Sequence, residues 1–112
     1  MKLLIVSNQI SLDKSIGGAV VPCWAFKSWC DLKNVNCQLI SEVEFLNSEI
    51  YNVSGIFFTK VPNSIDTIIK AKKLNCKILL MMHAEFDIDM YINARKAIEI
   101  CDSIVGIGFD NY

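Results

Sequence analysis

The sequence predicts an α/β fold of the doubly wound, Rossmann-like class, with one parallel sheet in a single domain of residues 1–112. Short apolar runs alternate along the chain with longer stretches whose apolar residues recur at helical spacing. The apolar runs are continuous, which is typical of strands that are covered on both faces, as in parallel sheets. Strand–helix alternation of this kind predicts parallel strands joined by right-handed crossovers.

The expected strands are five apolar runs, each bounded by polar or turn residues. They cover residues 3–6, 37–40, 55–59, 77–82 and 103–107. The fourth run is the strongest, and His83 ends it. We expect the spatial order 3-2-1-4-5, in which the winding of the sheet reverses between strands one and four.

The first expected helix follows a mostly polar loop over residues 8–18 and has one apolar stripe. The stripe consists of Val21, Ala25, Trp29 and Leu32, at spacings of four, four and three. This spacing predicts that the stripe faces the core. Trp24 and Phe26 lie outside it, and we expect them to pack in the core or against a partner.

Three further helices are expected between the later strands. Ser41 and Glu44 form a capping box for a short helix. A second helix follows the turn at Pro62 and extends over residues 65–74, and a third covers residues 91–100. The core-facing residues of the last helix are expected to be Ile92, Ala94, Ala97 and Ile98.

Composition restricts the classes of function. The chain is 53% hydrophobic, and its 112 residues are enough for one core without disulfides or metals. Eleven basic and twelve acidic residues give a net charge of −1, which leaves no electrostatic footprint for nucleic acid. No apolar run approaches the roughly 20 residues that span a bilayer. We therefore expect a soluble protein.

The five cysteines include no Cys-x-x-Cys pair. Buried, reduced thiols are the ordinary reading of such a pattern, and they indicate a reducing, hence cytoplasmic, compartment. We expect no metal site. Asp87 and Asp89 form a D-x-D pair, but they precede a helix, where carboxylates favour the helix dipole.

The candidate site lies at the carboxyl ends of the strands, where ligands of open α/β sheets bind. Gly17 and Gly18 stand directly before the first helix; glycines allow close approach of a ligand, and the free N–H groups of a helix start favour an anion. His83 is expected to donate a hydrogen bond to substrate, and Glu85 to orient it or contact the substrate.

Several nucleotide-binding and catalytic motifs do not occur in the loop that follows the first strand. The glycines form neither a G-x-G-x-x-G fingerprint nor a Walker loop. Ser7 and Asn8 stand where phosphotransfer receivers and haloacid-type hydrolases need an aspartate, and Ser7 lacks the glycines of a nucleophile elbow.

On these residues the chain resembles the amino-terminal domain of a GT-B glycosyltransferase of the retaining, nucleotide-sugar-dependent type. The resemblance rests on the opening strand (1–7), the Gly-Gly segment (15–19), the strand that ends in a histidine (78–85) and an acidic residue before the last strand (101–105). It covers nearly the whole chain. Residues 34–36, Asn-Val-Asn, depart from the family's Gly-His before the second strand.

The resemblance implies transfer of a sugar from a nucleotide-sugar donor to an acceptor, with no cofactor and no metal. By position, Gly17 and Gly18 face the donor phosphates and the acceptor, and His83 hydrogen-bonds the reacting sugar. It also implies a second domain that holds most of the donor site, so the chain is expected to be the amino-terminal half of a two-domain enzyme.

A non-enzymatic Rossmann-like or flavodoxin-like module is the alternative. Such a module binds a nucleotide, or holds a partner protein on apolar surface that no second domain covers. A peripheral membrane contact and self-association through an exposed sheet edge also stay open.

Overall fold

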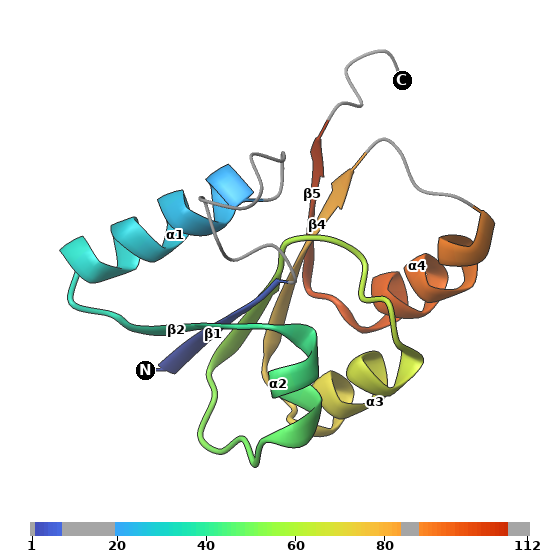
Figure 1. Ribbon diagram of the computed structural model, residues 1–112, viewed down its shortest axis with the longest axis horizontal. Helices are drawn as coiled ribbons and strands as arrows, with labels where there is room; N and C mark the ends of the chain where they lie inside the picture. The colour runs from blue at the N-terminus through green and yellow to red at the C-terminus, as the bar shows by residue number, and fades with distance from the viewer. Residues whose placement is uncertain (1, 8–19, 84–87, 108–112) are drawn as a thin grey trace.

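The computed structural model describes residues 2–7, 20–83 and 88–107, and the fold class is as predicted (Figure 1). Five strands alternate with four helices. The strands are β1 (Lys2–Val6), β2 (Asn36–Ile40), β3 (Gly55–Phe58), β4 (Lys77–His83) and β5 (Ser103–Ile107). The helices are α1 (Val20–Leu32), α2 (Glu42–Asn47), α3 (Ile65–Lys73) and α4 (Ile88–Ile100). All neighbouring strands pair in parallel.

The strand order is β2-β1-β3-β4-β5, so the expected order 3-2-1-4-5 is wrong. Residues of β1 pair with β2 on one side and with β3 on the other. The burial of the strands explains this order. All four residues of β3 are buried, whereas Asn36 and Gln38 of β2 are exposed, so β3 suits the middle of the sheet and β2 its edge. The winding therefore reverses between β1 and β3, as in flavodoxin-like sheets.

One face of the sheet is covered by α2, α3 and α4, and the main core lies between these helices and the sheet (Figure 1). The strands contribute alternate residues to this face, among them Leu4, Ile56 and Leu80. Phe45 of α2 is completely buried, and its ring meets that of Phe58 edge-on at 6.3 Å. The strands and helices of this face thus share one apolar core.

On the opposite face, α1 is the only helix among the described residues. Phe26 and Cys30 of α1 pack onto the sheet, and the Phe26 ring meets Phe57 edge-on with a centroid distance of 5.0 Å. The remaining members of this smaller cluster are the buried Ile5, Cys37 and Met81, with partly buried apolar residues around them. The core on this face is centred on β1 and β3.

The expected core stripe of α1 is wrong for every member whose side chain is described. Ala25 is exposed, Trp29 is 52% exposed and Leu32 is 82% exposed. Phe26 and Cys30, one turn apart, face the sheet instead. Because α1 is apolar around most of its circumference, helical periodicity did not identify its inner side. The side chain of Val21 lies outside the described part.

Caps and turns hold the connections between these elements. The predicted N-cap at Ser41 is confirmed, since its hydroxyl accepts a hydrogen bond from the Glu44 N–H at 3.1 Å. The Nζ of Lys70 donates to the carbonyl oxygens of Phe45 and Ser48 and so binds the carboxyl end of α2, where a cation is favourable. Asn34, Asn52 and Asn75 take positive φ angles, which asparagine tolerates.

The last helix begins three residues earlier than expected, at Ile88. Ala94 and Ala97 are buried, as predicted. Ile92 and Ile98 are 60% and 43% exposed, so they do not face the core.

Candidate functional site

The carboxyl edge of the sheet is the expected ligand site, and in a parallel sheet all strands end there. β1 ends at Val6 and is followed by Ser7, β3 ends at Phe58 and is followed by Thr59 and Lys60, and β4 ends at His83. Across the sheet the edge therefore runs from Ser7 through Thr59 and Lys60 to His83.

The predicted site residues are only partly within the described structure. Gly17, Gly18 and Glu85 lie outside the described residues. His83 is the last residue of β4, as expected, and its backbone is in register with Ile107 of β5.

The expected direct neighbourhood of strands one and four is wrong, because β3 lies between them. At about 4.8 Å per strand, β1 and β4 are roughly 10 Å apart. A ligand that contacts both the loop after β1 and His83 must therefore pass over the end of β3.

Polar residues at the end of β3 occupy the middle of this edge. Thr59 is completely buried, and its N–H donates to the Val6 carbonyl at 3.4 Å. Lys60 follows and is half-buried. The N–H of Ser7 donates to the Ile40 carbonyl at 3.0 Å, which fixes the end of β1 against β2. Lys60 could have been found from the sequence, since it is a cation that directly follows a predicted buried strand. The wrong strand order did not place it in the middle of the carboxyl edge.

The loop after β3 is held from two sides. The buried carboxylate of Glu42 accepts hydrogen bonds from the N–H groups of Asn63 and Ser64, both at 3.2 Å. From α4, the side-chain amide of Asn93 donates to the carbonyls of Pro62 and Asn63 at 3.1 and 2.9 Å. Glu42 thus has a structural role, and Lys60 projects from an anchored loop.

The hollow at this edge is small when only the described residues are considered. It measures about 10 Å³, which is about the volume that one water-sized sphere requires. Its lining residues are Val6, Ser7, Glu42, Phe58, Lys60, Val61 and Pro62. Among the described residues alone, this hollow is too small to hold a ligand larger than water.

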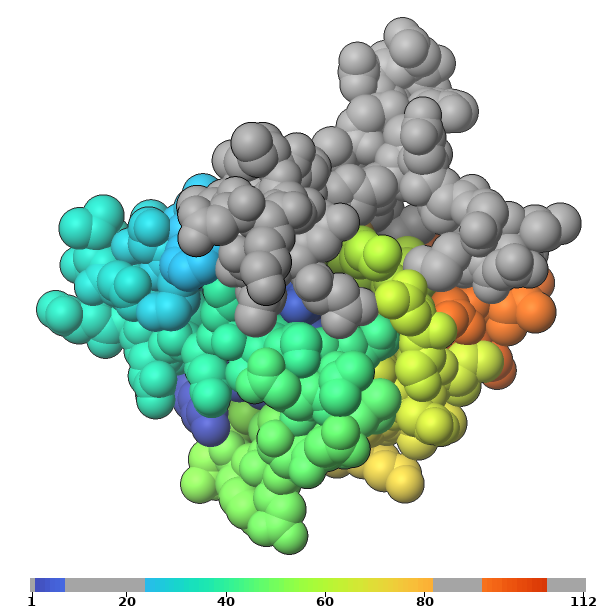
Figure 2. Space-filling view, viewed as in Figure 1, coloured from blue at the N-terminus to red at the C-terminus, as the bar shows by residue number. Residues whose placement is uncertain are grey.

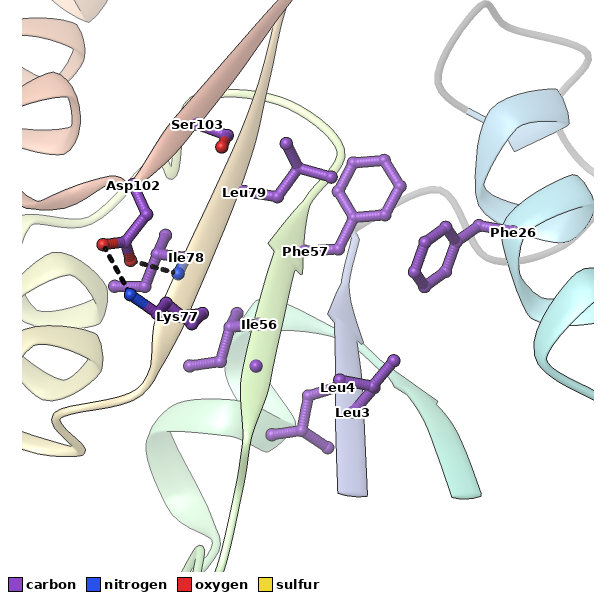
Figure 3. Close-up of a pocket in the computed structure, with 11 residues that line it drawn as sticks. Leu3, Leu4, Phe26, Ile56, Phe57, Lys77, Ile78, Leu79, Asp102 and Ser103 are labelled. Atoms are coloured by element: carbon purple, nitrogen blue, oxygen red, sulfur yellow. Dashed lines mark hydrogen bonds and ion pairs between the residues drawn. The ribbon is translucent and has the colours of Figure 1, made fainter. Parts of the chain in front are cut away.

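A much larger hollow, of about 330 Å³, lies on the face of the sheet that α1 covers in part (Figure 3). In Figure 3, Phe26, Phe57 and Leu79 point toward one another at one side of it. Its strand residues include Gly55, Lys77 and Ser103, the first residues of β3, β4 and β5. It therefore lies toward the amino ends of the strands, away from His83.

This larger hollow is apolar with a polar rim. At Gly55 a Cβ atom would lie 3.1 Å from the Cδ2 atom of Leu3, so a side chain there would crowd Leu3. On the rim, Asp102 accepts a hydrogen bond from the Ile78 N–H at 2.8 Å, and its other oxygen lies 3.8 Å from the Nζ of Lys77. Aromatic and aliphatic side chains thus form the floor of the hollow, and one ion pair lies on its rim.

The described cysteines are free thiols with suppressed acidity. Burial, together with the neighbouring Cys30, raises the pKa of the Cys37 thiol to about 12. Burial also raises the pKa of Cys76 and of Cys101. A thiol with a raised pKa stays protonated at neutral pH and is a poor nucleophile. Among the residues that the structure describes, no group of three or more metal-ligating side chains comes together.

Comparison with known proteins assigns the chain to no family. No protein-family model, curated protein or solved structure matches the chain. In the described ranges, no helix is both long enough and apolar enough to cross a membrane.

Proposed function

We propose that the chain is the acceptor-side domain of a nucleotide-sugar-dependent glycosyltransferase, with its ligands bound at the carboxyl edge of the sheet. The observation that carries the proposal is the order of polar groups along that edge. The segment with Gly17 and Gly18 follows β1, Lys60 follows β3, and His83 ends β4. An extended ligand with separate phosphate and sugar parts suits such a line of groups.

In this proposal each group has a different chemical task. The Lys60 ammonium neutralises a donor phosphate, as a compact point charge does in many phosphate sites. The backbone at Gly17 and Gly18 approaches the phosphates and the acceptor, and His83 donates a hydrogen bond to the reacting sugar. Most of the donor site belongs to a second domain, as the resemblance to GT-B glycosyltransferases implies.

Binding measurements on the 112-residue chain test the proposal first. Uridine, guanosine and adenosine diphosphates and their sugar conjugates are titrated by NMR, which also maps the edge. We expect one nucleotide series to shift resonances of Ser7, Lys60 and His83, and Lys60→Gln to weaken binding about tenfold, as expected for the loss of one charged phosphate contact. Lys33→Gln, an exposed lysine after α1, is the matched control.

Sugar transfer by the whole protein tests the enzymatic part. His83→Ala and Gly18→Val are expected to abolish transfer while the fold, followed by circular dichroism, stays intact. If both variants transfer sugar at the unaltered rate, the glycosyltransferase proposal is wrong.

A non-enzymatic flavodoxin-like module is a second candidate, which the strand order favours. The winding reverses between β1 and β3, and ligands of such sheets bind at that point. Lys60 stands beside this point, so a nucleotide phosphate there needs no histidine. Nucleotide binding that depends on Lys60 and is indifferent to His83→Ala, without turnover of any nucleotide sugar, would select this candidate.

A further inference from the structure

Two of the described cysteines lie in contact between α1 and the sheet. Cys30 of α1 is completely buried, Cys37 of β2 is 8% exposed, and both belong to the small core cluster on this face. Both are free thiols, and a side-chain hydrogen bond joins them. A single buried cysteine is ordinarily inert, but two thiols in contact form a pair that one two-electron oxidation joins.

The backbone brings this pair together across one short turn. Only residues 33–35 separate α1 from β2. The Cys30 carbonyl accepts a hydrogen bond from the Val35 N–H at 2.9 Å, and Asn34 within the turn takes a φ angle of 58°. Cys37 is fixed in turn by the parallel pairing of β2 with β1. The turn and the strand pairing thus keep the two thiols in contact.

The other cysteines are placed differently. Cys23 lies in the same helix as Cys30, seven residues away, so at 1.5 Å per residue their Cα atoms are about 10 Å apart along the helix axis. A disulfide requires a Cα separation below about 7 Å. Cys76 and Cys101 pack against the main core cluster, on the opposite face of the sheet. Cys37 is therefore the partner that the fold gives to Cys30.

Charged groups of α1 act on this pair. Lys27 and Asp31, one turn apart, form an ion pair with 2.7 Å between Nζ and Oδ1. Burial and the neighbouring Cys30 raise the pKa of the Cys37 thiol to about 12, whereas the Lys27 ammonium acts in the opposite direction and favours the thiolate. The Cys37 thiol is therefore protonated at neutral pH, and a cation is near enough to stabilise the thiolate once the proton is lost.

We propose that Cys30 and Cys37 form an oxidation site, at which a small-molecule disulfide such as oxidised glutathione produces an intramolecular disulfide between α1 and β2. In Figure 2, α1 stands at one margin of the molecule. It is the only helix on its face among the described residues, and β2 is an edge strand. Oxidation therefore ties a helix with few neighbours covalently to the edge of the sheet. This inference does not depend on the proposed function.

The oxidation takes place in two thiol–disulfide exchanges. Cys37, the more exposed of the two, loses its proton, and its thiolate attacks one sulfur of oxidised glutathione. The S–S bond of glutathione breaks, a mixed disulfide forms on Cys37, and the released glutathione thiolate takes up the proton. The Cys30 thiolate then attacks the Cys37 sulfur and releases the second glutathione, which takes up the Cys30 proton. Two cysteine thiols are thus oxidised, and one glutathione disulfide is reduced to two thiols.

Equilibration of the folded 112-residue chain with mixtures of reduced and oxidised glutathione tests the proposal. Mildly alkaline pH speeds the exchange, because it raises the share of thiolate. After alkylation of the remaining thiols, the chain is digested with trypsin and analysed by mass spectrometry. Cleavage after Lys27, Lys33 and Lys60 places Cys30 and Cys37 on separate peptides, 28–33 and 34–60. We expect a disulfide that joins these two peptides.

The same equilibrium in guanidinium chloride distinguishes a pair that the fold holds together from any two cysteines of one chain. We expect the equilibrium constant for disulfide formation to be at least about tenfold larger in the folded chain than in the unfolded chain. The oxidised chain should accordingly unfold at a higher guanidinium concentration than the reduced chain. This comparison uses the unaltered chain, so it does not depend on whether a variant folds.

Cysteine variants supply the matched controls. Cys30→Ala and Cys37→Ala are each expected to abolish the intramolecular disulfide and to leave at most a mixed disulfide with glutathione. Cys76→Ala and Cys101→Ala remove thiols from the other face of the sheet and are expected to retain it. Circular dichroism of each reduced variant shows whether the fold is intact.

Four results would overturn the proposal. The first is a folded chain that stays reduced at every glutathione ratio, and the second is a reaction that stops at the mixed disulfide. The third is a disulfide that joins other tryptic peptides or persists in Cys37→Ala. The fourth is an equilibrium constant that is equal in the folded and the unfolded chain.

Discussion

The two faces of the sheet consist of neighbouring residues of the same strands, yet the described helices cover them to different extents. Leu80 faces α2, α3 and α4 and is completely buried, whereas Leu79 faces the hollow beside α1 and is half-buried. The difference is not one of strand composition, because both faces are apolar. The difference lies in how much of each face the described helices cover, since the larger core cluster lies on the face of α2, α3 and α4.

The largest expected effect is a stability difference between these two adjacent leucines. Leu80→Ala removes a fully buried side chain from the covered face and should cost about 3–5 kcal/mol of the free energy of unfolding. Leu79→Ala should cost about 1–2 kcal/mol, because part of its side chain is already in water. Urea unfolding measures both. Equal losses would mean that the hollow is as well covered as the opposite face.

A smaller effect is expected from the buried carboxylate that anchors the loop after β3. Glu42→Gln keeps the shape of the side chain but weakens the hydrogen bonds to the N–H groups of Asn63 and Ser64, at a cost of about 1–2 kcal/mol. Glu99→Gln, on the exposed side of α4, is the control and should change stability by less than about 0.5 kcal/mol. Amide hydrogen exchange should localise the Glu42→Gln effect to residues 60–64. Unaltered exchange there would contradict the anchoring role.

The last effect is confined to alkaline pH, where stability depends on a buried thiol of the α1 face. The pKa of Cys37 is about 12 in the folded chain, against an ordinary value of 9.0. The unfolded thiol ionises first, so its contribution to stability is complete below pH 9 and is lost as the pH rises toward 12. Cys37→Ala should therefore flatten the decline in stability across this range, whereas Cys101→Ala, at a less buried thiol, should flatten it less. A decline that Cys37→Ala leaves unchanged would rule out this origin.

The sequence predicted the class and the elements of the fold because each strand is a continuous apolar run with clear boundaries. It did not predict the strand order, which depends on which strand is most deeply buried. The exposed Asn36 and Gln38 indicate an edge strand, and the unbroken run of Gly55–Phe58 indicates a central one. That contrast was present in the sequence, but the strand order was predicted only from the order of the elements along the chain.

The α1 helix shows where periodicity fails for a physical reason. Its strongest stripe, with Trp29 and Leu32, was expected to face the core and is exposed, while Phe26 and Cys30 face the sheet. Helical periodicity identifies an apolar side of a helix. When a helix has more than one apolar side, periodicity does not identify which of them faces the sheet. The position of His83 at the end of β4 was predicted correctly, and its role stays a prediction. The place of Lys60 in the middle of the edge followed only from the observed strand order, in which β3 lies between β1 and β4.

Titration of the chain with nucleotides, followed by NMR, tests the proposed site at the carboxyl edge of the sheet most directly. We expect one nucleotide series to shift the resonances of Ser7, Lys60 and His83, and Lys60→Gln to weaken its binding about tenfold. Shifts confined to other parts of the chain, or binding that Lys60→Gln leaves unaltered, would contradict a phosphate site at this edge.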